Sequence, residues 1–173
     1  MSQSLLDIAR QTIDLESRSV AALADRLGPD FERAVQALAQ TKGRVIISGI
    51  GKSAVIAQKI VATFNSTGTP AVFMHAADAI HGDLGMILPE DVVVLISKSG
   101  ESPEIKTLVP LIREFGNTLI ALSGKLDSYL ATHADIVIDT VVEQEACPNN
   151  LAPTTSTTAQ LVLGDALAIC LMK

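Results

Sequence analysis

Aromatic residues are scarce in this chain of 173 residues: they make up 3% of it, and there is no Trp. Because 48% of the residues are nonetheless hydrophobic, the core must be built mainly from Val, Ile, Leu and Ala. Aliphatic cores of this kind are typical of parallel sheets covered by helices on both faces. The length is that of one domain, and we expect residues 1–173 to form it.

Positive charge, cysteine and long apolar runs are also in short supply. The formal net charge of −6 argues against a nucleic-acid partner, which would need a basic face. Cys147 and Cys170 are too few for a disulfide framework and indicate a reducing compartment. The N-terminus lacks the pattern of a signal peptide, and no apolar run is long enough to span a membrane. We therefore expect a cytoplasmic protein with no membrane partner.

Strand-like and helix-like segments alternate after two N-terminal helices, which we expect within residues 3–40. Hydrophobic periodicity places these helices at 3–27 and 30–40, separated by a Gly-Pro break. The βα core follows over 43–173. Its predicted strands cover 44–48, 71–74, 91–97, 118–122 and 136–141, and its helices cover 52–66, 76–84 (a turn), 102–115, 127–133 and 154–172. This alternation predicts a three-layer αβα sandwich whose five-stranded parallel sheet has the flavodoxin-like order 2-1-3-4-5.

Two serine-containing loops, residues 48–53 (SGIGKS) and 97–102 (SKSGES), follow the first and third predicted strands. Each leads into a helix, where free backbone N–H groups, the helix dipole and short hydroxyl donors favour an anion. The predicted strand order brings both loops to the switch point of the sheet. The pattern predicts a phosphate site built from serines. The alternative is a pair of ordinary helix caps, although capping needs one hydroxyl rather than three.

Nucleotide-binding motifs fit these loops poorly. Residues 51–53 (GKS) match the end of a P-loop, but that motif requires glycine at position 46, where Ile46 stands. Residues 49–54 (GIGKSA) match the looser dinucleotide fingerprint. The acidic residue that would bind the ribose is expected at the end of the second strand, which Met74 and His75 occupy instead. The sequence therefore disfavours a nucleotide cofactor.

Histidines and carboxylates gather in the segments that follow predicted strands. Residues 75–83 contain two His and two Asp, which could bind a metal, although their spacing matches no standard signature. Among the glutamates, those in helix first turns commonly serve the helix dipole. Glu145 differs because it lies in the loop after the fifth strand, where a carboxylate can act as a general base. The five hydroxyl residues at 154–158 exceed what capping needs and indicate either a ligand or an interface.

These segments together resemble the sugar isomerase (SIS) domain, and within it the arabinose 5-phosphate isomerases, from the first helix to Lys173. The serine loop is typical of the whole superfamily, whereas the HGDLGM and EACP blocks are typical of the isomerase subgroup. The residues that carry the resemblance are 49–53 (GIGKS), 67–70 (TGTP), 81–86 (HGDLGM), 97–102 (SKSGES), 145–148 (EACP) and 151–154 (LAPT).

The resemblance implies an aldose–ketose isomerase that interconverts D-ribulose 5-phosphate and D-arabinose 5-phosphate through an enediol. It implies a homotetramer that needs no cofactor and feeds the Kdo sugar of lipopolysaccharide. The implied catalytic residues are Lys52, His81, Glu104 and Glu145. The implied substrate-binding residues are Ser53, Gly68, Thr69, His75, Ser97, Lys98, Ser99, Ser102 and Thr154. His75 also matches a histidine that can hold an inhibitory zinc.

The implied chemistry sets expectations for these side chains. Proton transfer between C1 and C2 suits a carboxylate base with a raised pKa, and we expect Glu145 to be that base, with Glu104 as the rival. A lysine can stabilise the enediolate, and a bound phosphate orients the substrate.

Three departures from the family pattern are visible. Lys98 stands where many relatives have Asn, and Asn149 and Asn150 replace small residues after the EACP block. Many relatives continue into CBS domains and a further functional histidine, so we expect either a truncated chain or a SIS-only protein. Two other functions stay open. A sugar-phosphate sensor would not need catalysis, but no helix-turn-helix segment is evident. A hexulose 6-phosphate isomerase shares the fold, but the EACP block favours the pentose substrate.

Overall fold

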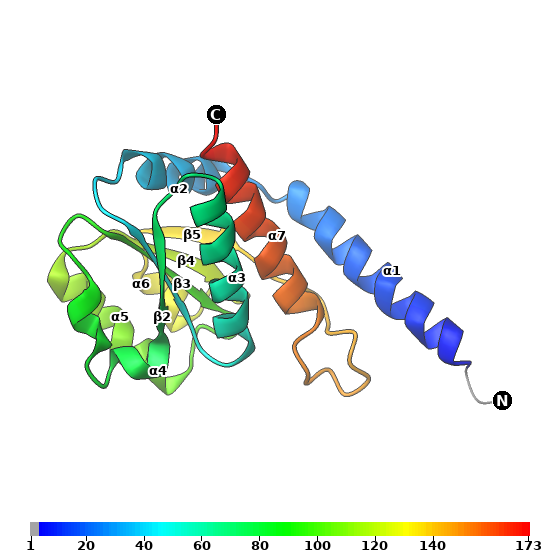
Figure 1. The fold of residues 1–173 in the computed structure, drawn as a ribbon. Coiled ribbons are helices and arrows are strands. Elements are labelled where there is room, and N and C mark those ends of the chain that lie inside the picture. The colour runs from blue at the N-terminus through cyan, green and yellow to red at the C-terminus, as the bar shows by residue number, and fades with distance from the viewer. Residues whose placement is uncertain (1–3) are drawn as a thin grey trace.

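The five strands form one parallel sheet of order β2-β1-β3-β4-β5 in a computed structural model that describes residues 4–173 (Figure 1). The inner strands β1, β3 and β4 are buried along their whole length, as expected for strands covered on both faces. The predicted αβα sandwich and strand order are confirmed. The strands are β1 Val45–Gly49, β2 Ala71–His75, β3 Val92–Ser97, β4 Leu119–Ser123 and β5 Ile136–Asp139.

Two helical layers cover the sheet. Residues of α2, α3 and α7 pack on one face, and residues of α4, α5 and α6 pack on the other. α1 contacts α7 and projects away from the body of the molecule (Figure 1). The helices are α1 Leu5–Ala24, α2 Pro29–Gln40, α3 Lys52–Ser66, α4 Ala76–Ala79, α5 Pro103–Phe115, α6 Tyr129–His133 and α7 Thr155–Cys170, with a 3-10 turn at Asp83–Met86.

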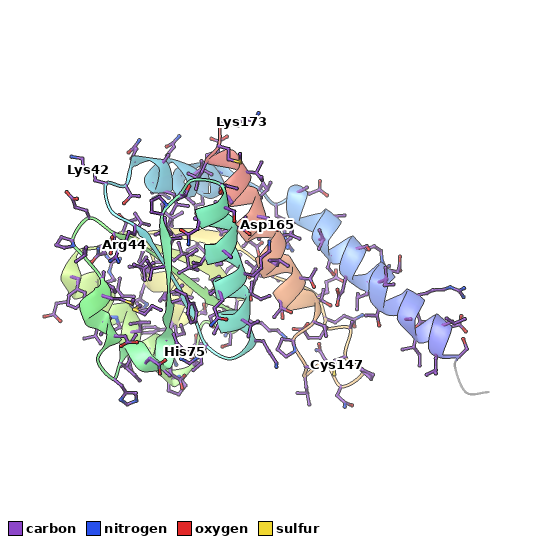
Figure 2. All side chains as sticks on the ribbon, in the orientation of Figure 1. Lys42, Arg44, His75, Cys147, Asp165 and Lys173 are labelled. Atoms are coloured by element: carbon purple, nitrogen blue, oxygen red, sulfur yellow. The ribbon has the colours of Figure 1, made fainter. Side chains whose placement is uncertain are left out.

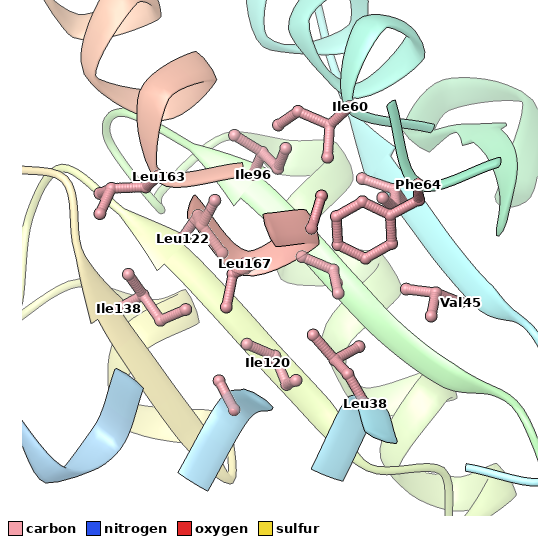
Figure 3. Packing of buried hydrophobic residues seen from close by; sticks show 14 of the residues in the cluster. Leu38, Val45, Ile60, Phe64, Ile96, Ile120, Leu122, Ile138, Leu163 and Leu167 are labelled. Carbon is pink, nitrogen blue, oxygen red and sulfur yellow. The ribbon is translucent and has the colours of Figure 1, made fainter. Parts of the chain in front are cut away.

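The larger core cluster lies between the sheet and the α3–α7 pair. Phe64 and Leu167 are fully or almost fully buried there, against Ile120 and Leu122 of β4 (Figure 3). Gly164 lets α7 approach α3 closely, because a Cβ atom at this position would collide with Ile60. This close packing places the first turn of α7 beside the first turn of α3, at the edge of the sheet where the strands end.

Several predicted boundaries differ from the structure, and three elements illustrate this. The helix expected at 3–27 begins at Leu5 and ends at Ala24, and residue 3 lies outside the described residues. The strand expected at 136–141 ends at Asp139, whose carboxylate accepts a hydrogen bond from the Val141 N–H (2.7 Å) and turns the chain. The last helix begins at Thr155 rather than at residue 154. None of the helices in residues 4–173 is long and apolar enough to cross a bilayer.

Asp91 anchors the opposite edge of the sheet, where the strands begin. It is 2% exposed, accepts hydrogen bonds from the N–H groups of Arg44 (2.7 Å) and Leu88 (2.9 Å), and pairs with the Arg44 guanidinium (2.8 Å). Burial alone would raise the pKa of Asp91, but these hydrogen bonds outweigh it and hold the pKa below its usual range. The ionised form is therefore part of the folded structure.

Asp91→Ala is expected to lower the free energy of unfolding by about 2–4 kcal/mol, because several buried donors lose their acceptor. Urea denaturation at neutral pH measures the loss. Since the folded-state pKa is lowered, the contribution is present above the unfolded pKa and disappears as the pH falls through the folded one. The exposed Asp127→Ala is the control, and equal stabilities of the two variants would contradict the role of Asp91.

Candidate active site

The serine loop, residues 97–102, leaves β3 and opens α5, and within residues 4–173 its hydroxyl groups donate no hydrogen bond. The Ser97 hydroxyl accepts a hydrogen bond from the Gly100 N–H (2.9 Å), and that of Ser99 accepts from the Glu101 N–H (3.3 Å). Ser102 caps α5 by accepting from the Ile105 N–H (3.4 Å). Each oxygen acts as an acceptor within the loop, so each O–H proton remains available to a ligand. Three such donors beside a helix N-terminus suit an anion.

Contacts with α6 hold the serine loop in shape. Gly100 has a φ of 63°, and a Cβ atom there would collide with Ser128. The Gly100 carbonyl accepts from the Leu130 N–H (3.1 Å), and the Glu101 carboxylate accepts from the Tyr129 N–H (2.8 Å). Glu101 therefore fastens the loop to its neighbour, and the loop is organised without a ligand.

The first turn of α3 supplies the second loop of the predicted phosphate site. Gly51 precedes the helix with a φ of 59°, and Lys52 and Ser53 follow it. Lys52 is exposed. The Ser53 hydroxyl donates to the side-chain carbonyl of Gln160 on α7 (3.1 Å), so its single proton is already used in this arrangement. Ser53 must turn away from Gln160 to donate to a phosphate.

Glu145 is 3% exposed and accepts a dense set of hydrogen bonds. Its Oε2 accepts from the N–H groups of Thr154 (2.9 Å) and Ser156 (3.1 Å) and from the Thr154 hydroxyl (3.2 Å). Its Oε1 accepts from the Ser156 hydroxyl and lies 2.7 Å from Lys98 Nζ. The carboxylate thus joins the EACP loop to the first turn of α7 and to the serine loop.

The pKa of Glu145 is lowered, which corrects the expectation of a raised one. Burial alone would raise this pKa, but Lys98, the Ser156 hydroxyl and the backbone N–H groups of Thr154 and Ser156 lower it from its ordinary 4.5 to about 2. A carboxylate with such a pKa is a weak base at neutral pH, where a pKa near the working pH is most effective. Glu145 is therefore anchored as an anion.

Other predicted residues lie at the same edge of the sheet. His75 ends β2, His81 lies in the exposed segment after α4, and Glu104 is half-buried in the first turn of α5. Figure 2 labels His75 and Cys147 at one end of the molecule and Lys42 at the other. Thr154 lies there too, but its hydroxyl donates to Glu145 and accepts from the Ala146 N–H (2.9 Å), so it shapes the loop.

Gly68 and Thr69 do not join this group in the chain described. They lie between α3 and β2, before β2 begins, and the neighbouring Pro70 carbonyl accepts from the Val45 N–H (2.9 Å) at the start of β1. The parallel sheet therefore places them at the edge opposite to the serine loop, about one strand length away. The TGTP block is a turn between α3 and β2, and substrate binding by Gly68 and Thr69 stays a prediction.

The predicted zinc ligand His75 has a buried Nδ1 that has no hydrogen-bond partner among the described residues and lies 3.8 Å from Asp78 Oδ2. Within residues 4–173, no three His, Cys, Asp or Glu side chains are grouped to hold a metal. Two nearby groups fall short of the four ligands usual for a structural zinc site. Zinc binding at His75 stays a prediction.

The sequence did not identify the residues that hydrogen-bond to Glu145 and Ser53. Ser156 binds Glu145, Gln160 binds Ser53, and the Asn150 side chain accepts from the Glu145 N–H (2.8 Å). Ser156 lies within the run of five hydroxyls, which was the available signal. Gln160 is fully buried in α7, its Nε2 has no hydrogen-bond partner in the described part of the chain, and no local sequence pattern marks it.

Comparison with known proteins places this arrangement in a family. The family model described as SIS domain matches residues 37–170. The chain belongs to the SIS domain family. Arabinose 5-phosphate isomerase KdsD of Pseudomonas aeruginosa is 52% identical over 100% of this chain, and GutQ of Escherichia coli, also named an arabinose 5-phosphate isomerase, is 48% identical over 100% of it. The match covers 54% of each relative, so the chain spans about half the length of these curated SIS proteins.

Solved structures agree on the SIS fold. The Escherichia coli protein c3406, solved in complex with arabinose 5-phosphate, has a TM-score of 0.93 and 39% identity, with 99% of this chain and 92% of that chain covered. The sugar isomerase domain of an RpiR transcription factor from Sphaerobacter thermophilus has a TM-score of 0.77 at 20% identity, over 96% of this chain and 89% of that one. The second similarity shows the fold alone.

Proposed function

We propose that the protein is an aldose–ketose isomerase that interconverts D-ribulose 5-phosphate and D-arabinose 5-phosphate. The observation that carries the proposal is the junction of the serine loop with Glu145, in a chain that matches curated arabinose 5-phosphate isomerases over its length. A relative with 39% identity was solved with arabinose 5-phosphate bound. Supply of the Kdo pathway, a cytoplasmic location and independence of cofactors stay predictions from the sequence.

The proposed mechanism assigns separate tasks to the two ends of the substrate. Hydroxyl protons of Ser97, Ser99 and Ser102 bind the phosphate, which fixes the sugar and lowers the entropy cost of reaction. C1 and C2 lie far from the phosphate in a five-carbon chain, so the proton must be moved by groups of other loops. A carboxylate, Glu145 or Glu104, takes the proton from one carbon and returns it to the other. The Lys52 ammonium stabilises the enediolate oxygen between these steps.

The deciding assay is incubation with ribulose 5-phosphate and detection of arabinose 5-phosphate by chromatography. Turnover of a hexulose 6-phosphate in place of the pentose would favour the hexulose isomerase. Tight binding of sugar phosphates without exchange of the C–H proton with deuterated solvent would favour a sensor. The absence of both binding and turnover would contradict the proposal.

Replacing Ser99 and Ser102 together by alanine is expected to raise the dissociation constant for a pentose 5-phosphate at least ~10-fold. Each hydroxyl that donates to a charged group contributes roughly 1.5 kcal/mol or more. Calorimetric titration measures the change, and Thr107→Ala in the exposed part of α5 is the control. Unchanged affinity of the double variant would remove the serine loop from the phosphate site.

We also propose a homotetramer that uses α1 in its contacts. Leu5, Leu6 and Ile13 on this helix are 85%, 67% and 66% exposed, and Leu23 is the buried residue of the helix. An apolar helix face of this kind is typical of a subunit interface. Light scattering at micromolar concentration is expected to give four times the chain mass, and Leu6→Glu with Ile13→Glu is expected to reduce it. A monomeric wild-type protein would contradict the proposal.

A further inference from the structure

Lys98 is the one contact of the Glu145 carboxylate, among those described, that does not come from the first turn of α7. Thr154 and Ser156 donate the other hydrogen bonds, through two N–H groups and two hydroxyls. Lys98 comes from the serine loop, and its ammonium lies 2.7 Å from Oε1. Lys98 can therefore leave Glu145 while α7 continues to hold the carboxylate in place.

Lys98 also belongs to the loop that we assign to the phosphate. Its side chain is 44% exposed on a flexible four-carbon stem, between Ser97 and Ser99, whose hydroxyl groups donate to no other described residue. A phosphate monoester carries a charge of about −1.5 to −2 at neutral pH, compared with −1 for a carboxylate. A phosphate in the serine loop therefore competes with Glu145 for the same ammonium.

We propose that the substrate's phosphate draws Lys98 away from Glu145, and that this departure lets Oε1, which keeps its hydrogen bond from the Ser156 hydroxyl, take a proton from the substrate carbon. Lys98 is then a positioning residue: it keeps the carboxylate ionised and covered in the empty site and joins the phosphate in the occupied one. The inference rests on the proposed function, since it assumes a sugar phosphate and a base at Glu145. It extends that function by linking recognition of the phosphate to activation of the base.

The groups around Glu145 determine whether its pKa rises or falls when Lys98 leaves. The charged and titratable groups near it are Lys98, Cys147 two residues along the loop, and Arg18, which lines the same cavity of about 480 Å³ beside α1. Glu16 lies two residues before Arg18 on α1, where its carboxylate accepts a hydrogen bond from the Thr158 hydroxyl (3.2 Å). Arg18 is paired with Asp14 (3.0 Å) and exposed, so it does not replace Lys98. Once Lys98 leaves, burial and the phosphate charge both raise the pKa of Glu145.

The transfer of Lys98 from Glu145 to the phosphate is called the exchange below. Calorimetric titration with inorganic phosphate tests this exchange without requiring turnover. Lys98→Met is expected to weaken phosphate binding at least ~10-fold. Glu145→Gln is expected to tighten it about 3-fold or more, because the carboxylate no longer competes for Lys98. Lys106→Met is the matched control, since Lys106 pairs with the half-buried Glu101 at the same distance of 2.7 Å. Opposite shifts in the first two variants support the exchange, whereas unchanged binding in either folded variant overturns it.

Proton uptake gives a second readout. At neutral pH, titrations in two buffers of different ionisation enthalpy are expected to show more protons taken up by the wild type than by Lys98→Met or Glu145→Gln when phosphate binds. Equal uptake in the wild type and Glu145→Gln overturns the exchange, as does failure of the wild type to bind phosphate. Proton-linked binding without conversion of ribulose 5-phosphate would instead leave the exchange standing and contradict the proposed isomerase.

The pH dependence of turnover distinguishes a Lys98 that leaves Glu145 from one that stays paired with it. The profile of kcat/KM reports the free enzyme, and that of kcat reports the occupied one. Lys98→Met is expected to move the acidic limb of kcat/KM to higher pH and to leave that of kcat in place, because Lys98 has already left Glu145 in the wild-type complex. A shift of both limbs would show that the ion pair persists during turnover and would overturn the exchange.

Discussion

Glu145→Gln is expected to reduce turnover by roughly 10²–10⁴, with affinity for a pentose 5-phosphate undiminished. Glutamine keeps the shape of the side chain and can still accept from the first turn of α7, but it cannot take a proton. The measurement is the exchange of the substrate C–H proton with deuterated solvent. Glu104→Gln is the matched variant, because Glu104 also lies beside the serine loop. Near-normal exchange in Glu145→Gln, with exchange lost in Glu104→Gln, would transfer the role to Glu104.

The same substitution also tests the structural task of Glu145. The lowering of its pKa from 4.5 to about 2 corresponds to about 3 kcal/mol of folding free energy. Because the folded-state pKa is lowered, this contribution is present above the unfolded pKa and is lost as the pH falls through about 2. We therefore expect Glu145→Gln to be less stable than the wild type at neutral pH and about equal to it near pH 2. Urea titration separates this loss from the loss of activity.

Local patterns were sufficient to predict the architecture. Runs such as residues 92–96 (VVVLI) require a strand covered on both faces, and Ser102-Pro103 and Gly116 mark the two ends of α5. The alternation of strands and helices then left few possible strand orders for a parallel sheet. Boundaries that depend on side-chain hydrogen bonds could not be predicted: the carboxylate of Asp139, rather than a break in hydrophobicity, ends β5.

The position of the serine loop could be predicted because one strand carries it, whereas phosphate binding by this loop stays a prediction. Ser97, Ser99 and Ser102 follow one strand, so their convergence needs no tertiary contact. Glu145 was placed at the correct edge, but the direction of its pKa depends on Lys98 and Ser156, which are distant in sequence. Gly68 and Thr69 belong to a recognisable block but precede their strand. The rule that parallel strands present ligand sites at their carboxyl ends separates them from the serine loop within one chain, and substrate binding by these two residues stays a prediction.

Lys52→Met is expected to reduce kcat by roughly 10²–10³ with little change in affinity for a pentose 5-phosphate, as for other donors that stabilise a developing oxyanion. Among the described residues, no ion pair engages Lys52, whereas Lys98 is paired with Glu145. Because the side chain of Lys52 is exposed, its loss leaves the folded chain within about 0.5 kcal/mol of the wild type.

The contrast between the two lysines makes this prediction specific. Lys98→Met acts on the phosphate and is expected to raise KM, whereas Lys52→Met acts on the enediolate and is expected to lower kcat. Steady-state kinetics on both variants, with Lys59→Met on the same helix as a surface control, measures the two effects. Lys59 pairs with Asp165 on α7, away from the serine loop. A Lys52→Met variant with normal kcat and raised KM would assign Lys52 to the phosphate and leave the enediolate to backbone N–H groups of the same edge.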